Sequence, residues 1–394
     1  MMLRDDFLKY QAKTTPFPMG MEVKRAKGSY IFDQKGKKHL DFVAAVSACS
    51  LGHRHPAVVR AMKKQLNRYL HVMVYGEYAQ SPAVELCKLL AQHLPPSLEV
   101  TYLTNSGTEA IEGAMKLAKR VTGKTGFVAA KQAYHGSTQG ALSLLGVESQ
   151  KEGYQPLLNE VDFISFNNLA ELEKINANTA GVVLETIQGG AGFILPENDY
   201  LKAVKARCEE VGALLILDEI QPGIGRTGKL FAFEHYGITP DILVIGKGLG
   251  GGMPIGAFCS SADFMEQLTH KPSLGHITTF GGNPVIAAAA LATLKTIYRK
   301  KLMAQIDEKE QLFRTLLVHP KIKQINGRGL MLAPIFEREE EVPAIVQSCL
   351  DKGLILFFLL WEKKAVRISP PLNISHREIK KGCAILLEAL DELQ

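Results

Sequence analysis

Between about residues 100 and 260, short apolar runs alternate with amphipathic stretches. The helical patterns are clearest at 109–120 and 200–211, where apolar residues recur at helical spacing. The apolar runs are rich in β-branched residues and occupy 100–103, 127–130, 161–165, 181–186, 214–217, 242–245 and 255–260. Near-continuous apolar strands separated by helices are typical of a mostly parallel sheet covered on both faces. We therefore predict an α/β fold built on a mostly parallel, seven-stranded sheet.

The two ends of the chain have a different pattern. Residues 29–32 predict a strand leading into a hairpin turn at 33–36, and an alanine-rich helical stretch at 285–300 leads into a mixed α/β portion. We expect both ends to pack together as a smaller domain. The predicted segments are 1–45 joining the small domain, 46–284 forming the large, ligand-binding domain, and 285–394 completing the small domain.

The composition indicates a globular chain, with 46% hydrophobic and 22% charged residues. The net charge of +6 is spread along the sequence, so we expect no nucleic-acid partner. The six cysteines show neither CxxC pairs nor metal-ligand spacing, which favours free thiols in a reducing compartment and no metal site. No apolar run is long enough for a membrane helix and no secretory signal is visible. We therefore expect a cytoplasmic protein without a membrane partner.

Two charged residues stand at the ends of predicted strands, where parallel sheets bind ligands. Lys247 lies in a glycine-rich turn after 242–245, and Asp218 directly follows 214–217. An amine that binds an aldehyde covalently and a carboxylate that keeps a pyridine nitrogen protonated are the groups that pyridoxal 5′-phosphate (PLP) chemistry needs most. The pair predicts a PLP site.

Lys247 also has other interpretations. Gly246, Gly248 and Gly251 match the dinucleotide pattern G-x-G-x-x-G, but that pattern should open a helix, and 253–258 reads as another strand. A phosphate-binding P-loop would have a serine or threonine after Lys247, and here Gly248 follows. A solvated loop lysine remains the simplest alternative. The apolar surroundings favour catalysis, because desolvation lowers an amine's pKa.

Further candidate residues follow the same logic. Ser106, Gly107 and Thr108 open a predicted helix, where free N–H groups bind phosphate, although a helix cap explains them equally well. Tyr134 is able to stack on a heteroaromatic ring or to be an ordinary core tyrosine. Near Asp218, Ile220 would cover the face of the cofactor ring opposite Tyr134, and Gln221 would reach the phenolic oxygen of that ring. Arg367 suits a substrate carboxylate, or is structural.

Together these motifs resemble the class III aminotransferases, the PLP-dependent group that includes acetylornithine, ornithine and 4-aminobutyrate aminotransferases. The resemblance covers nearly the whole chain and is sharpest at 217–228 and 246–256. It implies the type I fold of PLP-dependent transferases. It also implies transfer of an amino group, often a terminal amine, from an amino acid to an oxo acid by a ping-pong mechanism.

The resemblance also implies roles for individual residues. Lys247 binds the cofactor and moves the proton, and Asp218 binds the pyridine nitrogen. Thr279 reaches the phosphate of the neighbouring subunit, which makes a homodimer the expected unit. Further cofactor contacts are implied for Ser106, Gly107, Thr108, Tyr134, Ile220 and Gln221, and substrate contacts for Arg367, Ser137 and Thr278.

Two positions depart from the family pattern. Ser137 stands where acetylornithine and ornithine members usually have an arginine for a second substrate carboxylate. Gly190 stands where they usually have a glutamate that masks the carboxylate-binding arginine during one half-reaction. Our hypothesis is that the donor, the acceptor or both differ from ornithine and 2-oxoglutarate.

Three other functions remain open from the sequence. An aminomutase or decarboxylase on the same scaffold would need no oxo acid acceptor. A nucleotide-dependent dehydrogenase would use the Gly246 turn. A PLP-binding protein without turnover would keep the same residues.

Overall fold

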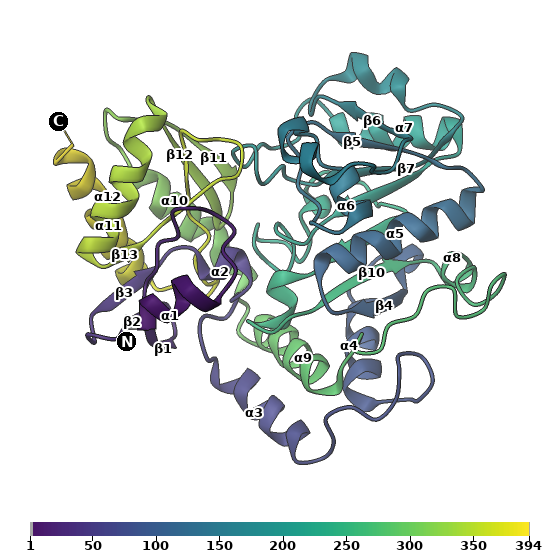
Figure 1. The fold of residues 1–394 in the computed structure, drawn as a ribbon, viewed down its shortest axis with the longest axis horizontal. Helices are drawn as coiled ribbons and strands as arrows, with labels where there is room; N and C mark the ends of the chain where they lie inside the picture. Colours follow the sequence, from purple (N-terminus) through teal and green to yellow (C-terminus); the bar gives the residue numbers. More distant parts are fainter. Residues whose placement is uncertain (1–2, 394) are drawn as a thin grey trace.

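A seven-stranded sheet forms the centre of the larger of two lobes in the computed structural model, which describes residues 3–393 (Figure 1). Its strand order is β4-β10-β9-β8-β7-β5-β6, and only β10 runs antiparallel to its neighbours. The strands are β4 (Val100–Thr104), β5 (Gly126–Ala130), β6 (Val161–Ile164), β7 (Thr179–Glu185), β8 (Leu214–Asp218), β9 (Ile242–Ile245) and β10 (Gly256–Ser260). The predicted α/β fold with a mostly parallel seven-stranded sheet is confirmed.

Both faces of this sheet are covered by helices, as β8 illustrates. Leu214 and Ile216 belong to the core cluster that includes α5 (Gly107–Thr122), whereas Leu215 and Leu217 belong to the one that includes α7 (Tyr200–Val211). Alternate residues of a strand point to opposite faces, so a continuous apolar run is needed to fill both cores. Burial on both sides explains why the central strands lack the apolar–polar alternation of a solvent-facing sheet.

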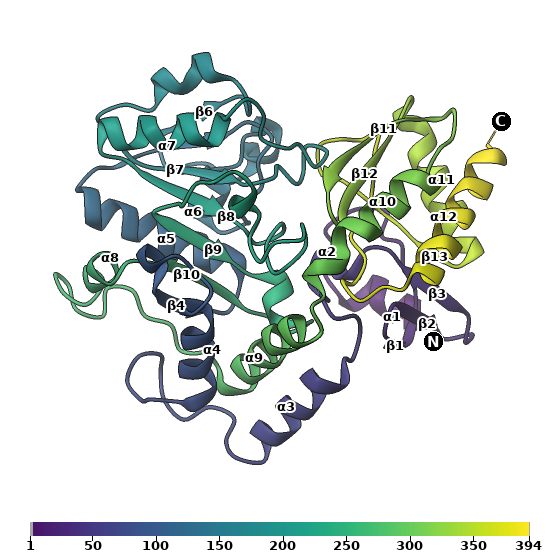
Figure 2. The same ribbon diagram turned by 180° about the vertical axis from the view of Figure 1, so that it is seen from behind.

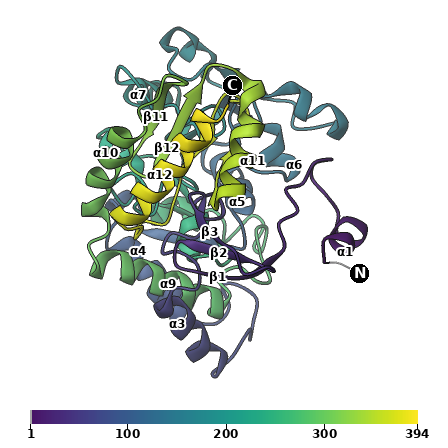
Figure 3. The same cartoon turned by 90° about the vertical axis from the view of Figure 1, so that its left-hand side faces the viewer.

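The smaller lobe joins the two ends of the chain. Its four-stranded sheet, β1-β2-β3-β13, pairs β3 in parallel with β13, and the predicted turn at 33–36 closes with the Gly36 N–H donating to the Asp33 carbonyl at 3.0 Å. The strands are β1 (Val23–Lys27), β2 (Tyr30–Asp33), β3 (Lys38–Asp41), β11 (Ile322–Arg328), β12 (Met331–Phe336), β13 (Leu354–Ile355), β14 (Phe357–Phe358) and β15 (Val366–Arg367). Figure 3 shows α11 (Val342–Lys352) and α12 (His376–Asp391) side by side on this lobe, with α10 (Ile306–Leu316) nearby.

The remaining helices are α1 (Leu3–Tyr10), α2 (Ala44–Ser47), α3 (Pro56–Leu66), α4 (Ser81–Ala91), α6 (Gln139–Ser143), α8 (Ala262–Glu266) and α9 (Pro284–Arg299). The predicted helix at 285–300 is α9, and it packs against α3 and α4 beneath the larger lobe (Figure 2). The division at residues 45/46 and 284/285 stays a prediction. Of the helices between residues 3 and 393, none combines the length and apolar character that crossing a bilayer requires.

Candidate active site

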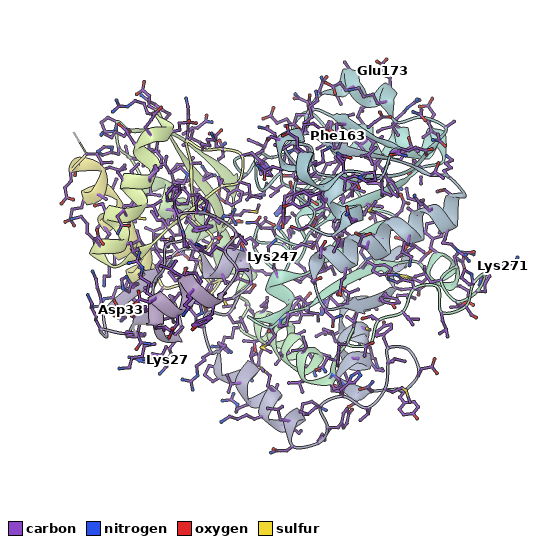
Figure 4. All side chains as sticks on the ribbon, viewed as in Figure 1. Lys27, Asp33, Phe163, Glu173, Lys247 and Lys271 are labelled. Atoms are coloured by element: carbon purple, nitrogen blue, oxygen red, sulfur yellow. The ribbon has the colours of Figure 1, made fainter. Side chains whose placement is uncertain are left out.

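The carboxyl ends of the central strands open into a cavity of about 520 Å³ between the lobes. Lys247 lies at the centre of the molecule where the two lobes meet (Figure 4). Nine residues expected from the sequence line this cavity: Gly107, Thr108, Tyr134, Ser137, Asp218, Ile220, Gln221, Lys247 and Arg367. The cavity therefore gathers groups from strands far apart in the sequence.

Lys247 begins a short 3₁₀ turn, Lys247–Gly250, directly after β9. Its backbone has a positive φ of 36°, and the turn ends at Gly251 in the left-handed region before the chain enters β10. No α-helix starts here, so the turn does not form the helix-opening phosphate site of a dinucleotide fold. Burial lowers the pKa of the Lys247 amine; the Asp218 carboxylate opposes this shift, and the Arg367 charge adds to it. A lowered pKa makes the neutral, nucleophilic amine more available.

Asp218 is the last residue of β8 and is buried. One carboxylate oxygen accepts the Ile220 backbone N–H at 2.9 Å, and the other lies 2.8 Å from Nδ1 of His135. The Nε2 atom of His135 is buried without a hydrogen-bond partner. The imidazole thus fixes the carboxylate in place. The sequence interpretation did not assign His135 a role, although its place beside Tyr134 was a signal.

Glu185 adds a second buried carboxyl group that the sequence interpretation missed. It ends β7 in register with Asp218 on β8 and also lines the cavity. Burial first, and then the neighbouring Asp218 charge, raise its pKa well above the ordinary value. The Gly189 backbone N–H donates to its Oε2 atom at 3.2 Å. Its register opposite Asp218 is visible only in the folded sheet.

A polar cradle forms at the N-terminus of α5. The Oγ1 atoms of Thr108 and Thr138 are 2.7 Å apart. Gly136 has a φ of 135°, and a Cβ atom there would stand 2.2 Å from the Thr108 hydroxyl, so only glycine fits. Ser106 lies next to the cradle but does not line the cavity; its hydroxyl caps α5 by accepting the Glu109 N–H at 3.3 Å. Free N–H groups, hydroxyls and a positive helix end suit a phosphate.

Arg367 on β15 also lines the cavity and is only 4% exposed. Its Nε atom has no hydrogen-bond partner, and its guanidinium lies 5.8 Å from the ring centre of Phe193. Burial lowers the pKa of Arg367 to about 10, which Glu185 partly opposes. A buried cation without a full set of partners favours an anionic ligand.

Ser137 and Tyr134 stand close together at the cavity wall, with their hydroxyl oxygens 3.2 Å apart. Val46, Phe357, Phe358 and Leu360 form an apolar part of the wall that the sequence interpretation did not foresee. These four come from the ends of the chain, so no local motif marked them.

The structure does not bring Thr278 and Thr279 into this cavity. The Oγ1 atom of Thr278 accepts from the Asn105 side-chain amide at 3.2 Å, and Thr279 is exposed. Tyr75 donates its backbone N–H to the Thr278 carbonyl at 3.2 Å, which places this loop against residues 71–75. Within one chain, neither threonine takes part in the site.

The cavity has the groups that PLP requires. Lys247 lines the cavity with an amine of lowered pKa, and Asp218 has a fixed carboxylate that suits a pyridine nitrogen. Gln221 lines it with a buried Nε2 atom that has no hydrogen-bond partner. The cradle around Thr108 suits the phosphate. No cluster of three or more His, Cys, Asp or Glu residues arranged for a metal ion lies within residues 3–393.

Comparison with known proteins agrees with this geometry. The family model described as aminotransferase class-III matches residues 10–390. The chain is 38% identical to acetylornithine aminotransferase of Bacillus subtilis, covering 94% of this chain and 95% of the relative. It is also 38% identical to putrescine aminotransferase of Pectobacterium atrosepticum, in a match that covers 98% of this chain and 86% of the relative. The ornithine aminotransferase structure from Toxoplasma gondii, which has PLP at partial occupancy in its active site, superposes with a TM-score of 0.90 at 29% identity, covering 99% of this chain and 95% of that one.

Proposed function

The chain belongs to the class III aminotransferase family, and on this premise we propose that Lys247 is the residue that binds the cofactor and transfers the proton. The protein is a PLP-dependent aminotransferase with the type I fold. The observation that carries the assignment of Lys247 is its place in one cavity with Asp218 and the Thr108 cradle. Nothing in the comparisons favours an aminomutase, a decarboxylase or a dehydrogenase.

The residues divide the chemistry between them. PLP, when bound, withdraws electrons from the carbon that bears the donor's amine. Asp218, oriented by His135, would hold the ring nitrogen in its protonated form through a charge-assisted hydrogen bond. Lys247 Nζ removes the proton from the amine-bearing carbon in the first half-reaction and returns a proton to the acceptor's carbon in the second. Because the amine acts from a fixed position, proximity supplies much of the rate enhancement.

The other groups hold the cofactor and the substrates. Thr108 and Gly107 would hold the phosphate end of the cofactor, with Ser106 beside them capping α5, while Tyr134, Ile220 and Gln221 would contact the ring. Arg367 binds a carboxylate of the oxo acid, and Ser137 contacts the substrate's distal part.

A homodimer is the proposed functional unit, with Thr279 and Thr278 serving the partner's site. Exposed apolar side chains from two adjoining segments support this arrangement: Leu70, Val72, Tyr78, Leu274, Ile277 and Phe280. The segments contact one another through the rings of His71 and Phe280, whose centres are 4.7 Å apart. Exposed apolar patches of this kind mark interfaces.

A cytoplasmic location is proposed from cysteine usage. All six cysteines are free thiols, and five of them are buried. A reducing compartment preserves such thiols.

Stepwise half-reactions test the function. Purified protein mixed with an amino donor alone is expected to lose the absorbance of its bound cofactor and to release one carbonyl product. Adding an oxo acid afterwards is expected to restore the absorbance and produce an amino acid. Turnover that needs no oxo acid would contradict the assignment.

A further inference from the structure

The hairpin that carries Arg367 is anchored on Gly190 by the only tryptophan of the sequence. In this hairpin Phe357 of β14 pairs directly with Arg367 of β15. The connecting turn returns to the larger lobe, where the Trp361 backbone N–H donates to the Gly190 carbonyl at 2.9 Å and the Glu362 N–H donates to the same carbonyl at 3.3 Å.

The Trp361 indole occupies the space where a side chain at position 190 would lie. A Cβ atom built on Gly190 would stand 2.7 Å from Nε1 of Trp361 and 2.8 Å from its Cδ1. Both distances are below any ordinary contact, so an indole in this position excludes every residue except glycine at 190. Trp361 therefore leaves no room for an acidic side chain at position 190, at the edge of the cavity that contains Arg367.

Arg367 is consequently left without a masking carboxylate on this side of the cavity. The Glu185 charge acts on Arg367, but burial raises the pKa of Glu185 well above its usual value, which favours the neutral carboxyl. Among residues 3–393, no carboxylate comes within ion-pair distance of the guanidinium. A buried, unpaired guanidinium costs free energy unless the ligand supplies the anion.

This cost applies in both half-reactions, because position 190 supplies no side chain to cover Arg367 when a donor without a carboxylate binds. Arg367 lies in the same cavity as Lys247, and its charge acts on the Lys247 amine. A carboxylate held by Arg367 is therefore close to the carbon on which Lys247 acts.

Apart from Arg367, the residues with basic side chains that line the cavity are Lys247 and His135, which belong to the proposed cofactor site. Ser137 provides only a hydroxyl, already within 3.2 Å of the Tyr134 hydroxyl, and Val46, Phe358 and Leu360 make another part of the cavity wall apolar. A charged distal group on the donor would be desolvated there without a partner.

We propose that Trp361, seated on Gly190, is a specificity-determining residue that keeps Arg367 open in both half-reactions, so that the amino donor is an α-amino acid with an uncharged, apolar side chain. This inference rests on the proposed function, because it concerns the donor of the same half-reactions. The carboxylate of the donor and that of the oxo acid then occupy the same position in turn.

A matched pair of donors tests the inference in the holoenzyme. Leucine and 3-methylbutan-1-amine differ only in the carboxylate. Leucine is expected to convert the bound cofactor at least about 100-fold faster per unit concentration, because a site built for a polar group rejects the analogue that lacks it. Equal rates would overturn the inference, and so would conversion by ornithine or putrescine with none by leucine. Failure of every amine to convert the cofactor would instead overturn the proposed function.

A second measurement uses the tryptophan itself and needs no turnover. The emission of Trp361 is expected to change saturably when 4-methylpentanoate, the leucine skeleton without its amine, is added to the holoenzyme, and to stay constant with 4-methylpentan-1-ol. No response to the carboxylate would contradict the placement of Trp361 at this site.

Variants separate the indole from the rest of the hairpin. Gly190→Glu should displace the indole and supply a carboxylate to Arg367. The preference for leucine over 3-methylbutan-1-amine should then fall at least about 10-fold. The Trp361 emission should shift to longer wavelength. Trp361→Phe should retain most of the preference, and Trp361→Ala should lose part of it. Tyr154→Phe, an exposed aromatic far from these contacts in the sequence, is the control. An unchanged preference in folded Gly190→Glu would refute the role of this edge.

Discussion

The Nδ1 atom of His135 lies 2.8 Å from the Oδ2 atom of Asp218, and both side chains are buried. The two residues come from different elements: His135 from the loop after β5, and Asp218 from the last position of β8. The contact makes His135 the residue that positions the carboxylate proposed to bind the cofactor's ring nitrogen.

Replacing His135 with phenylalanine should weaken cofactor binding while leaving the fold intact. A hydrogen bond to a charged group contributes about 1.5–3 kcal/mol, so the dissociation constant for PLP should rise at least about 10-fold. Absorbance titration of the apoprotein measures this constant. His135→Asn, which keeps a donor, should recover part of the affinity, and unchanged affinity in His135→Phe would remove the positioning role.

Gly136→Ala should disrupt the polar cradle that is proposed to hold the phosphate. Gly136 has a φ of 135°, and the added methyl group would stand 2.2 Å from the Thr108 hydroxyl. We expect PLP affinity to fall at least about 10-fold, since either the glycine loop or Thr108 must move. Gly153→Ala is the matched control, because a Cβ atom there meets nothing within 4 Å. Equal PLP affinity in the two variants would count against the cradle.

Much of this site was predictable because its residues follow strands directly. Lys247 and Asp218 each stand at the carboxyl end of an apolar run, and a parallel sheet aligns those ends at one edge. Ser106, Gly107 and Thr108 follow β4 and open α5 for the same reason. The order of the strands was not needed to see that these groups would converge.

The apolar wall was not predictable, because it depends on the folding of distant segments. Val46 reaches the cavity from α2, which is a left-handed turn because its four non-glycine residues, Ala44 to Ser47, all have positive φ values. No sequence preference predicts such a turn, since left-handed backbone is costly for residues with a Cβ atom. Asp41 helps to hold it by accepting the Val43 and Ala44 N–H groups at 2.8 and 2.9 Å. The Trp361–Gly190 contact likewise joins residues far apart in the sequence.

The pair formed by His53 and Asp41 should make stability depend on pH. Burial opposes the charged imidazole, but the Asp41 carboxylate, 2.7 Å from Nε2, and Cys49 outweigh it and raise the pKa of His53 to about 10. Because the folded pKa exceeds the unfolded value of 6.5, the stabilisation is complete below pH 6.5 and is lost as pH rises towards 10.

Comparing wild type with His53→Gln isolates this contribution. Urea unfolding at pH 6 and pH 9 measures the free energy of unfolding of both proteins. The excess of the wild type over His53→Gln should be smaller at pH 9 than at pH 6, by on the order of 2 kcal/mol after allowing for solvent screening. An advantage that stays constant or grows with pH would contradict the assigned ion pair.

Phe280→Asp should weaken the proposed dimer. Phe280 is 55% exposed, and its ring centre lies 4.7 Å from that of His71 in the adjoining segment. A carboxylate there would be desolvated on association, which costs several kcal/mol. Sedimentation velocity should show more monomer, together with lower cofactor affinity because Thr279 no longer reaches the partner's site. Val318→Asp, at a 76% exposed position on the smaller lobe, should leave the assembly unchanged.

The central claim is that the Lys247 amine itself carries the cofactor. Borohydride reduction of the holoenzyme followed by peptide mass mapping tests it most directly, because reduction makes the bond between lysine and cofactor permanent. The pyridoxyl group is expected on the peptide containing Lys247, and Lys247→Ala is expected to retain none. Labelling of a different lysine in wild type, or reduced protein without a covalently attached cofactor, would contradict it.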